Sequence, residues 1–547
     1  MKRFLLTAAA AVMLGGCAVT VDARGDLYAD TRPLPGSGVM EKSIAELQAD
    51  MTAGRATSEQ LVQMYLDRIE AIDRDGPRLQ SVLAVNPDAV AQARALDEER
   101  RAGRVRGPLH GVPILIKDNI ESLDPLPTTA GSLALKDNVT GRDAPLVARL
   151  RAAGAVILGK TNLSEWANIR SSKSTSGWSA MGGLTRNPYA IDRNACGSSS
   201  GSGAAAAASL AAAAVGTETD GSITCPSAIN GLVGIKPTVG LVSRTYVVPI
   251  SHSQDTAGPM TRSVADAAVL LTAMAGSDPL DKATAEADRR KSDYTQALDA
   301  GALRGKRIGV MRFDAGYDAK LDAVFDAAVA ELKAAGAEVV EIREFKAEAE
   351  VGRNELPVLL TELKADLNAY LASTPPSVKT RTLAEVIAFD REHADVEMPY
   401  FAQELFEQAE LTKGLTDPDY LKARETSFRL AGPEGIDRML KDNRLDALVA
   451  PTTGPAWTTD LVNGDHYAGS ATTLPAVAGY PHVTVPMGQV QGLPVGLSFI
   501  GPAWSEARLI ALAYAYEQRT HARRPPTYAP ASETLRELSS GVEPHRP

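Results

Sequence analysis

Three segments of the chain place polar, potentially reactive residues in apolar or glycine-rich surroundings. The first is residues 111–119, GVPILIKDN, in which Lys117 ends an apolar run. A lysine at the end of a buried strand is costly to keep charged. It is therefore either paired, as by Asp118, or partly neutral and available as a base. On this segment alone, a paired structural lysine is the simpler interpretation.

The other two segments are rich in glycine, serine and threonine. Residues 196–203, CGSSSGSG, lead into residues 204–215, of which nine of twelve are alanine. This pattern predicts a loop with an exposed backbone that feeds a tightly packed helix. Residues 216–223, GTETDGSI, are turn-forming, and their consecutive N–H groups could make an anion-binding nest. Taken singly, each segment could also be only a connector.

Two further motif matches do not fit their structural context. Residues 154–161, GAVILGKT, have the letters of a phosphate-binding loop, but the four residues between the glycines are AVIL, which predict a strand and leave no open loop. Residues 197–201, GSSSG, match a nucleophile elbow with Ser199 as nucleophile. That motif needs a strand directly before it, whereas residues 187–194 are turn-forming. No histidine after Ser199 stands in a context that marks it as a catalytic base.

Composition and charge exclude several classes of protein. The chain has 547 residues, 44% of them hydrophobic and 23% charged, which is typical of a folded globular protein. Its 57 Lys and Arg residues against 67 Asp and Glu give a formal charge of -10, with no basic stripe, so a nucleic-acid partner is not expected. The three cysteines show no metal-binding or redox spacing. The sequence therefore predicts neither a metal nor another cofactor.

The N-terminus has the pattern of an export signal. Lys2 and Arg3 precede an apolar run that is too short to span a bilayer, and the run ends in Leu-Gly-Gly-Cys. This ending resembles a bacterial lipobox, which would make Cys17 the lipidated first residue of a mature lipoprotein. Ordinary secretory cleavage a few residues later is the alternative. We expect a periplasmic protein that is anchored to the outer membrane only through this lipid, with a tether over residues 18–42.

Strand and helix patterns alternate after a capping box at residues 43–46, which predicts an α/β fold. No linker interrupts the body, so we expect one large domain over residues 43–530 and a tail over 531–547. Residues 345–440 are rich in helical patterns and read as an insertion on one side of the sheet. The uncharged residues 194–217 are mostly Gly, Ser and Ala, which predicts a buried segment and not a membrane span. The expected strands are residues 113–116, 155–158, 232–235, 307–310, 339–342, 447–450, 483–485 and 495–500. The expected helices include residues 264–274, 320–335 and 505–519.

Together, Lys117, Ser198 and Ser222 have the spacing of a Ser-Ser-Lys triad, with the two serines 24 positions apart. In this respect the chain resembles the amidase signature family over residues 43 to 525. The resemblance implies a single α/β domain with a twisted mixed sheet sandwiched between helices. Within that family the chain most resembles the bacterial peptide amidases, which remove the C-terminal amide of peptides. The stretches that carry the resemblance are LGKTNLSEWAN, CGSSSGS, GTETDGSI, NGLVGIKPTVGLVSR, SQDTAGPMTRSVADAA, LDALVAPTTG, AVAGYPHVTVPMG and AYAYEQRTHARRPP.

The resemblance also assigns roles to residues. It implies that Ser222 is the nucleophile, that Ser198 bridges it to the base and follows a cis peptide bond, and that Lys117 is the base. The backbone amides that it implies for the oxyanion hole are those of Thr219, Asp220, Gly221 and Ser222. These roles are chemically consistent, because a serine needs a base to become nucleophilic and a desolvated lysine can serve where no histidine is placed.

The chain departs from the common family pattern at two places. The usual Gly-Gly-Ser-Ser-Gly-Gly is replaced by CGSSSG at residues 196–201, and the second departure is close to Ser222. Asp220 stands two residues before Ser222, where glycine is frequent; aspartate tolerates unusual backbone angles, and its charge would repel acidic substrates. Cys196 and Cys225 flank the two serines, and whether they pair is open, although we expect buried free thiols.

We therefore expect an exported serine hydrolase that deamidates the C-terminal amide of peptides through an acyl-enzyme. Amidases of other small acyl, aryl or fatty acid amides are the alternative. A transamidase subunit is disfavoured because export removes the chain from tRNA and ATP, and a non-catalytic peptide-binding lipoprotein is disfavoured because all three triad residues are present. The oligomeric state is open, with a monomer expected.

Overall fold

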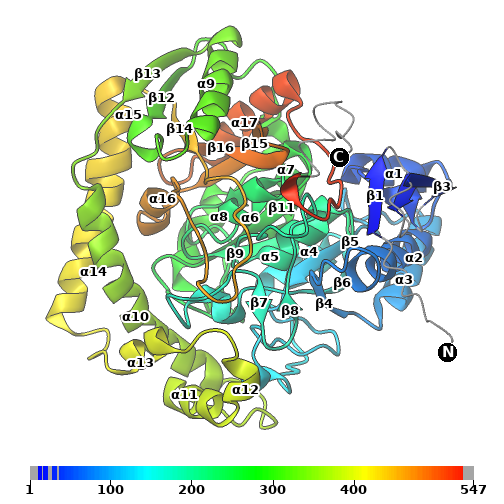
Figure 1. The fold of residues 1–547 in the computed structure, drawn as a ribbon, viewed down its shortest axis with the longest axis horizontal. Coiled ribbons are helices and arrows are strands. Elements are labelled where there is room, and N and C mark those ends of the chain that lie inside the picture. Colours follow the sequence, from blue (N-terminus) through cyan, green and yellow to red (C-terminus); the bar gives the residue numbers. More distant parts are fainter. Residues whose placement is uncertain (1–9, 15–16, 22–26, 34–35, 534–547) are drawn as a thin grey trace, which may run out of the picture.

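An eleven-stranded mixed sheet runs through the body of the molecule, flanked by helices (Figure 1). The computed structural model describes residues 10–14, 17–21, 27–33 and 36–533. The strand order is β13-β12-β14-β16-β15-β10-β11-β9-β5-β6-β4. The strands are β4 (Val82–Val85), β5 (Pro113–Lys117), β6 (Val156–Thr161), β9 (Ala213–Glu218), β10 (Val233–Lys236), β11 (Thr256–Thr261), β12 (Arg307–Met311), β13 (Glu338–Ile342), β14 (Ala447–Pro451), β15 (His482–Val490) and β16 (Leu493–Ile500). The predicted fold class, one large α/β domain around a mixed sheet, is confirmed.

Parallel and antiparallel pairs alternate in blocks along the sheet. Strands β13, β12 and β14 are parallel at one end, and β9, β5 and β6 are parallel near the other. Antiparallel pairs join these blocks through β16, β15, β10 and β11. Because β5 and β9 are parallel neighbours, their carboxyl ends meet at the same edge of the sheet, where ligands commonly bind in α/β folds.

All eight predicted strands are present in this sheet. The sheet also contains three strands that were not predicted, β4, β9 and β11. Strand β9 lies in the alanine-rich segment that we expected to be helical throughout. Helix α5 (Ser200–Ala207) ends before Ser209, whose φ of 54° is left-handed and cannot continue a helix. Alanine gives no β-branched signal, so the change from helix to strand leaves no local mark in the sequence.

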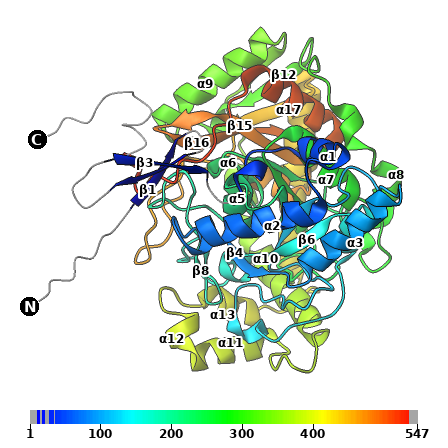
Figure 2. The same ribbon diagram turned by 90° about the vertical axis from the view of Figure 1, so that its right-hand side faces the viewer.

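Further helices lie outside the predicted insertion, and several of them contact the sheet. They are α1 (Ile44–Thr52), α2 (Ser58–Arg68), α3 (Ala89–Arg101), α4 (Pro145–Ala152), α6 (Thr224–Ile229), α7 (Val264–Met274), α8 (Ala287–Arg290), α9 (Ala319–Ala334), α16 (Thr473–Val477) and α17 (Glu506–Thr520). The predicted capping box is confirmed: the Ser43 side chain accepts from the Glu46 amide, and the Glu46 carboxylate accepts from the Ser43 amide at 2.8 Å. Figure 2 shows α2 and α3 side by side on one flank.

The expected helical insertion is present between β13 and β14. Its helices are α10 (Glu348–Ala372), α11 (Leu383–Glu392), α12 (Ala394–Glu397), α13 (Glu404–Glu410), α14 (Pro418–Ala431) and α15 (Asp437–Asn443). Helices α10 and α14 lie against each other along one side of the molecule (Figure 1). The insertion shares a hydrophobic cluster with the body, in which the Phe406 ring meets the Trp166 ring edge-on at 5.8 Å.

A polar cluster also holds α10 to the body. His252, Glu362 and Asp366 bring potential metal-ligand atoms within 4.8 Å of one another, which their distant positions in the sequence could not reveal. Glu362 accepts hydrogen bonds from Ser253 and Tyr420, at 2.8 and 2.7 Å. The imidazole of His252 lies 2.9 Å from the Asp366 carboxylate. These bonds make the cluster an anchor for α10.

The N-terminal residues form a separate antiparallel sheet of β1 (Ala10–Leu14), β2 (Cys17–Val21) and β3 (Leu27–Pro33). A further short hairpin consists of β7 (Trp178–Ser179) and β8 (Gly183–Leu184). Most of the predicted export signal and of the tail, residues 1–9, 15–16 and 534–547, lies outside the described residues, so both stay predictions. In the part of the chain that is described, no helix is long and apolar enough to cross a membrane.

Candidate active site

Lys117 is the last residue of β5, and its side chain is fully buried. Its Nζ donates a hydrogen bond to Ser198 Oγ at 2.7 Å and another to Thr217 Oγ1 at 2.9 Å. Thr217 lies on the neighbouring strand β9, and Asn119 donates to the same hydroxyl at 2.9 Å. The parallel pairing of β5 with β9 thus places the lysine next to the serine loop.

Burial lowers the pKa of Lys117 from 10.5 to about 7, and the charges of Asp255 and Glu218 only partly oppose this shift. The lowered pKa makes the neutral amine accessible near neutral pH. A neutral amine with a serine hydroxyl 2.7 Å away can accept a proton from it.

The alternative that Asp118 pairs with Lys117 is wrong. Asp118 points to the other side of the strand, where its carboxylate accepts from the amide of Thr129 at 3.1 Å and from the Thr129 hydroxyl. Burial raises the pKa of Asp118 to about 6, against the attraction of Lys160. Lys160 lies inside strand β6, so the residues that resemble a phosphate-binding loop are a buried strand, as predicted.

In the serine-rich loop before α5, neighbouring serine hydroxyls form hydrogen bonds with different partners. The peptide bond between Gly197 and Ser198 is cis, as the resemblance implied. Ser198 accepts from Lys117, whereas Ser199 is fully buried and donates to the carbonyl oxygen of Thr217 at 3.0 Å. A cavity of about 550 Å³ lies beside this loop, and Ser199 is not among the described residues that line it. This placement disfavours Ser199 as a nucleophile.

The turn after β9 carries Ser222. Glu218 accepts from the amides of Ile223 and Thr224 at 2.7 and 2.9 Å, which fixes the start of α6. Gly221 has a φ of 77°, a left-handed value that glycine adopts without strain, so the turn does not depend on unusual angles at Asp220. Within residues 36–533, none of the amides of residues 219–222 donates to a protein acceptor. These amides are thus available to bind an oxyanion.

The cavity of about 550 Å³ opens over this turn. Residues 219–222 line it, so Ser222, 8% exposed, faces the space. The loop bond from the Ser199 amide to the Ser222 carbonyl oxygen, at 3.2 Å, holds the two serine segments together. The structure thus gathers Lys117, Ser198 and residues 219–222 at one edge of the sheet, and the cavity has the size of a small-molecule site.

Asp220 lies in this wall with its carboxylate accepting from Thr473 Oγ1 at 2.8 Å. Burial raises the pKa values of both Asp220 and its neighbour Glu355, and the charge of Asp220 raises that of Glu355 further. The Gln254 amide group joins this pair to the turn, because it donates to Glu355 at 2.9 Å and to the Thr219 carbonyl oxygen at 3.3 Å. The raised pKa of Asp220 favours its neutral form, which repels an anionic substrate less than the carboxylate that we expected.

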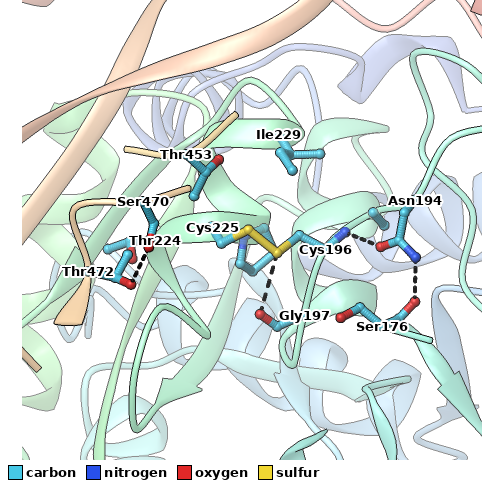
Figure 3. Close-up of a disulfide and its surroundings, with 12 residues drawn as sticks. Ser176, Asn194, Cys196, Gly197, Thr224, Cys225, Ile229, Thr453, Ser470 and Thr472 are labelled. Atoms are coloured by element: carbon cyan, nitrogen blue, oxygen red, sulfur yellow. Dashed lines mark hydrogen bonds between the residues drawn. A yellow bond between two sulfur atoms is a disulfide. The ribbon is translucent and has the colours of Figure 1, made fainter. Parts of the chain in front are cut away.

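The expectation of free thiols at Cys196 and Cys225 is wrong, because the two form a disulfide (Figure 3). Their Cα atoms are 6.1 Å apart, within the range that a disulfide can bridge. Their separation of 29 positions hides this proximity in the sequence. Both cysteines line the cavity, so the bond forms part of its wall.

Sequence reasoning also missed the distant walls of the cavity. Helices α10 and α13 of the insertion contribute Leu359 and Leu405, and residues 457–473 contribute Trp457 and Tyr467. Asp465 ties this second segment down by accepting from Trp457 Nε1 at 3.1 Å and from the Ser176 hydroxyl. No local pattern in the sequence marks these residues as part of a cavity wall. The sequence could have indicated them only as apolar residues that do not belong to the predicted core.

Comparison with known proteins agrees with this geometry. The family model "Amidase" matches residues 60–510. The Arabidopsis thaliana "Probable amidase" is 42% identical over 500 residues, which cover 90% of this chain and 92% of that protein. The solved structure of native peptide amidase from Stenotrophomonas maltophilia is 55% identical, with a TM-score of 0.86, and the match covers 91% of this chain and 100% of that one.

A second solved structure, of the peptide amidase PAM in complex with the competitive inhibitor chymostatin, is 56% identical with a TM-score of 0.87. This match covers 89% of this chain and 99% of that one. Each likeness spans nearly the whole folded body, including β5, the serine loop and the turn after β9. The chain therefore belongs to the amidase family, and it is a hydrolase that acts on amide bonds.

Proposed function

We propose that this amidase forms an acyl-enzyme on Ser222, with Ser198 as the bridging serine and Lys117 as the base. The observation that carries the proposal is the buried Lys117, with a pKa of about 7, whose Nζ lies 2.7 Å from Ser198 Oγ beside a cavity lined by Ser222. Only a neutral amine can take up a proton, and burial is what makes the lysine neutral near pH 7.

The proposed reaction has the following steps. Neutral Lys117 takes the proton of Ser198 Oγ, Ser198 takes the proton of Ser222, and Ser222 Oγ forms a bond to the amide carbon. The amides of residues 219–222 stabilise the negative charge on the carbonyl oxygen, and each such donor contributes about 3 to 4 kcal/mol. The C–N bond then breaks as the proton returns through Ser198 to nitrogen. Water hydrolyses the acyl-enzyme by the same route.

The substrate that we propose is the C-terminal amide of a peptide. The cavity of about 550 Å³ has room for more than a single small amide, and its wall combines serine and backbone groups with apolar side chains such as Ile250 and Leu359. Polar groups along one wall can bind the peptide backbone while the apolar wall takes a side chain. The two solved structures compared above, each more than half identical to this chain, are of peptide amidases, which supports this choice.

A substrate panel tests this proposal. C-terminally amidated peptides, N-acylated amino acid amides and fatty acid amides are incubated with the enzyme, and released ammonia is measured. We expect the amidated peptides to give the highest kcat/KM. The same peptides with free carboxyl termini are the control, and they should stay intact. Faster turnover of fatty acid amides, or cleavage of internal peptide bonds, would contradict the proposed substrate.

The electrostatic surroundings of Lys117 give a matched pair of variants. Asp255 favours the charged form of Lys117, so Asp255→Asn should lower the pKa of the lysine further. The rising limb of the pH–rate profile should then move to lower pH. Asparagine can still accept from the amides of Ile250 and Ser251, which donate to Asp255 at 2.8 and 2.9 Å, so the local fold is kept.

Asp118→Asn is the control, because Asp118 accepts hydrogen bonds from Thr129 and is influenced by the charge of Lys160. Lys117 donates instead to Ser198 and Thr217. We expect its pH–rate profile to rise at the same pH as that of the unmodified enzyme. If both variants moved the profile equally, or if neither did, the titration would not belong to Lys117 in the site described above.

We further propose that the protein is exported and anchored as a lipoprotein through Cys17. Cys17→Ser should then move the protein from the membrane fraction to the soluble periplasmic fraction, detected by immunoblotting. Stable anchoring takes more than one acyl chain, which a diacylated cysteine supplies. A protein that is already soluble with Cys17 intact would show that cleavage occurs elsewhere.

A further inference from the structure

The Cys196–Cys225 disulfide lies between the two segments that carry the proposed catalytic serines. Cys196 is two residues before Ser198, and Cys225 is three residues after Ser222. We propose that this disulfide positions Ser198 relative to Ser222, so that the enzyme is fully active only when the bond is formed. This inference rests on the proposed roles of the two serines.

The first argument is the conformation of Cys196. Its φ of 55° is left-handed, a conformation that is unfavourable for a residue with a side chain. Such a conformation persists only where the surroundings impose it. Here the Cys196 amide donates to Asn194 Oδ1 at 2.7 Å, and Asn194 is itself bound to the Ser176 carbonyl oxygen at 2.9 Å (Figure 3). The disulfide constrains the side chain of the same residue.

The second argument is the attachment of Cys225. It lies in the first turn of α6, and its amide donates to the Gly221 carbonyl oxygen at 2.8 Å, so it moves with the turn that carries Ser222. The disulfide therefore links the turn of the nucleophile to the loop of the bridging serine by a covalent bond. Proton transfer between two hydroxyls depends on their separation, and a misplacement of about 1 Å can cost about 100-fold in rate.

Other bonds between the two segments keep the fold intact without the disulfide. The Ser199 amide donates to the Ser222 carbonyl oxygen at 3.2 Å, and Asn230 Nδ2 donates to the Ala195 carbonyl oxygen at 3.0 Å. We therefore expect loss of the disulfide to disturb the placement of the serines and to leave the protein folded.

A small reductant can reach the bond, because both cysteines line the cavity even though their residues are 5% and 2% exposed. A dithiol such as dithiothreitol supplies two electrons and two protons. Its two S–H bonds break and its own disulfide forms, while the bond between Cys196 and Cys225 breaks to give two thiols. Disulfides persist in oxidising compartments, so this requirement fits the proposed export of the chain.

The test compares the oxidised enzyme, the dithiothreitol-treated enzyme and the variant Cys196→Ala/Cys225→Ala. Thiol titration shows whether the bond is reduced, and thermal unfolding shows whether each form is folded at the assay temperature. We expect kcat for an amidated peptide to fall about tenfold or more on reduction, with KM little changed, and to recover on reoxidation. The double variant should be equally slow and should not respond to dithiothreitol.

The rate at which a fluorophosphonate labels Ser222 separates this inference from the proposed function. An oxidised enzyme that is not labelled at Ser222 would contradict the nucleophile assignment. Equal labelling rates and equal kcat in the oxidised form and the double variant would overturn the positioning role of the disulfide. So would a loss of activity that coincides with unfolding, because the disulfide would then only stabilise the fold.

Discussion

Replacing Ser222 with alanine should reduce the release of ammonia from amidated peptides by about 10⁴- to 10⁶-fold, the scale seen when the nucleophile of a serine hydrolase is removed. Ser222 faces the cavity from the turn whose free amides lie at residues 219–222. Without its hydroxyl no acyl-enzyme can form, and only binding and the oxyanion donors remain. The rate is measured under saturating substrate with the unmodified enzyme as reference.

Labelling by a serine-reactive fluorophosphonate identifies the nucleophile directly. We expect mass spectrometry to find the label on Ser222 alone, and no label on the Ser222→Ala variant. Ser199→Ala is the matched control: Ser199 is buried and bonded to Thr217, so this variant should still be labelled at Ser222. A label on Ser199 in the unmodified enzyme would restore the nucleophile-elbow interpretation.

The sequence was sufficient to predict β5, one of the two parallel strands that position the site. Lys117 was expected at the end of a buried strand, and it is the last residue of β5. The apolar runs of eight strands and the helix Val264–Met274 were found because burial imposes a continuous apolar pattern or a helical period on the sequence. The resemblance to the amidase signature family supplied the pairing of Lys117 with the serine loop, which no local pattern reveals.

Three features could not be predicted because each depends on contacts between distant segments. Strand β9 begins inside an alanine-rich run, where neither helix nor strand is marked by side-chain type. The disulfide joins residues whose proximity arises only when the serine loop folds over α6. The cavity wall at Leu359 and Leu405 comes from the insertion, more than 130 residues after Ser222. Periodicity describes each element by itself, whereas these features are relations between elements.

The strand pairing also explains why this lysine is suited to proton transfer. Parallel pairing places Ile116 of β5 beside Val215 of β9, so that Lys117 lies next to the residues that precede Ser222. The same pairing buries Lys117 completely, and burial lowers its pKa to about 7. One structural relation therefore brings the base to the serines and makes it available in its neutral form.

Replacing Lys117 with alanine should lower the acylation rate by about 10³- to 10⁶-fold, as when a member of a catalytic triad is removed. In the unmodified enzyme, the rate should rise with pH through about 7 and level off above it, because deprotonation of Lys117 produces the active form. Stopped-flow or burst kinetics with an amidated peptide measure acylation across the pH range. Circular dichroism and thermal unfolding show whether the variant is folded.

Lys117→Arg distinguishes a base from a structural cation. Arginine stays protonated at every pH of the assay and cannot accept a proton, so we expect this variant to lose nearly as much activity as Lys117→Ala. A structural cation that only donates to Ser198 and Thr217, at 2.7 and 2.9 Å, could be replaced by arginine with a moderate loss. If Lys117→Arg kept near-full activity with an unchanged pH–rate profile, Lys117 would be a buried cation and the Ser-Ser-Lys mechanism would have to be abandoned.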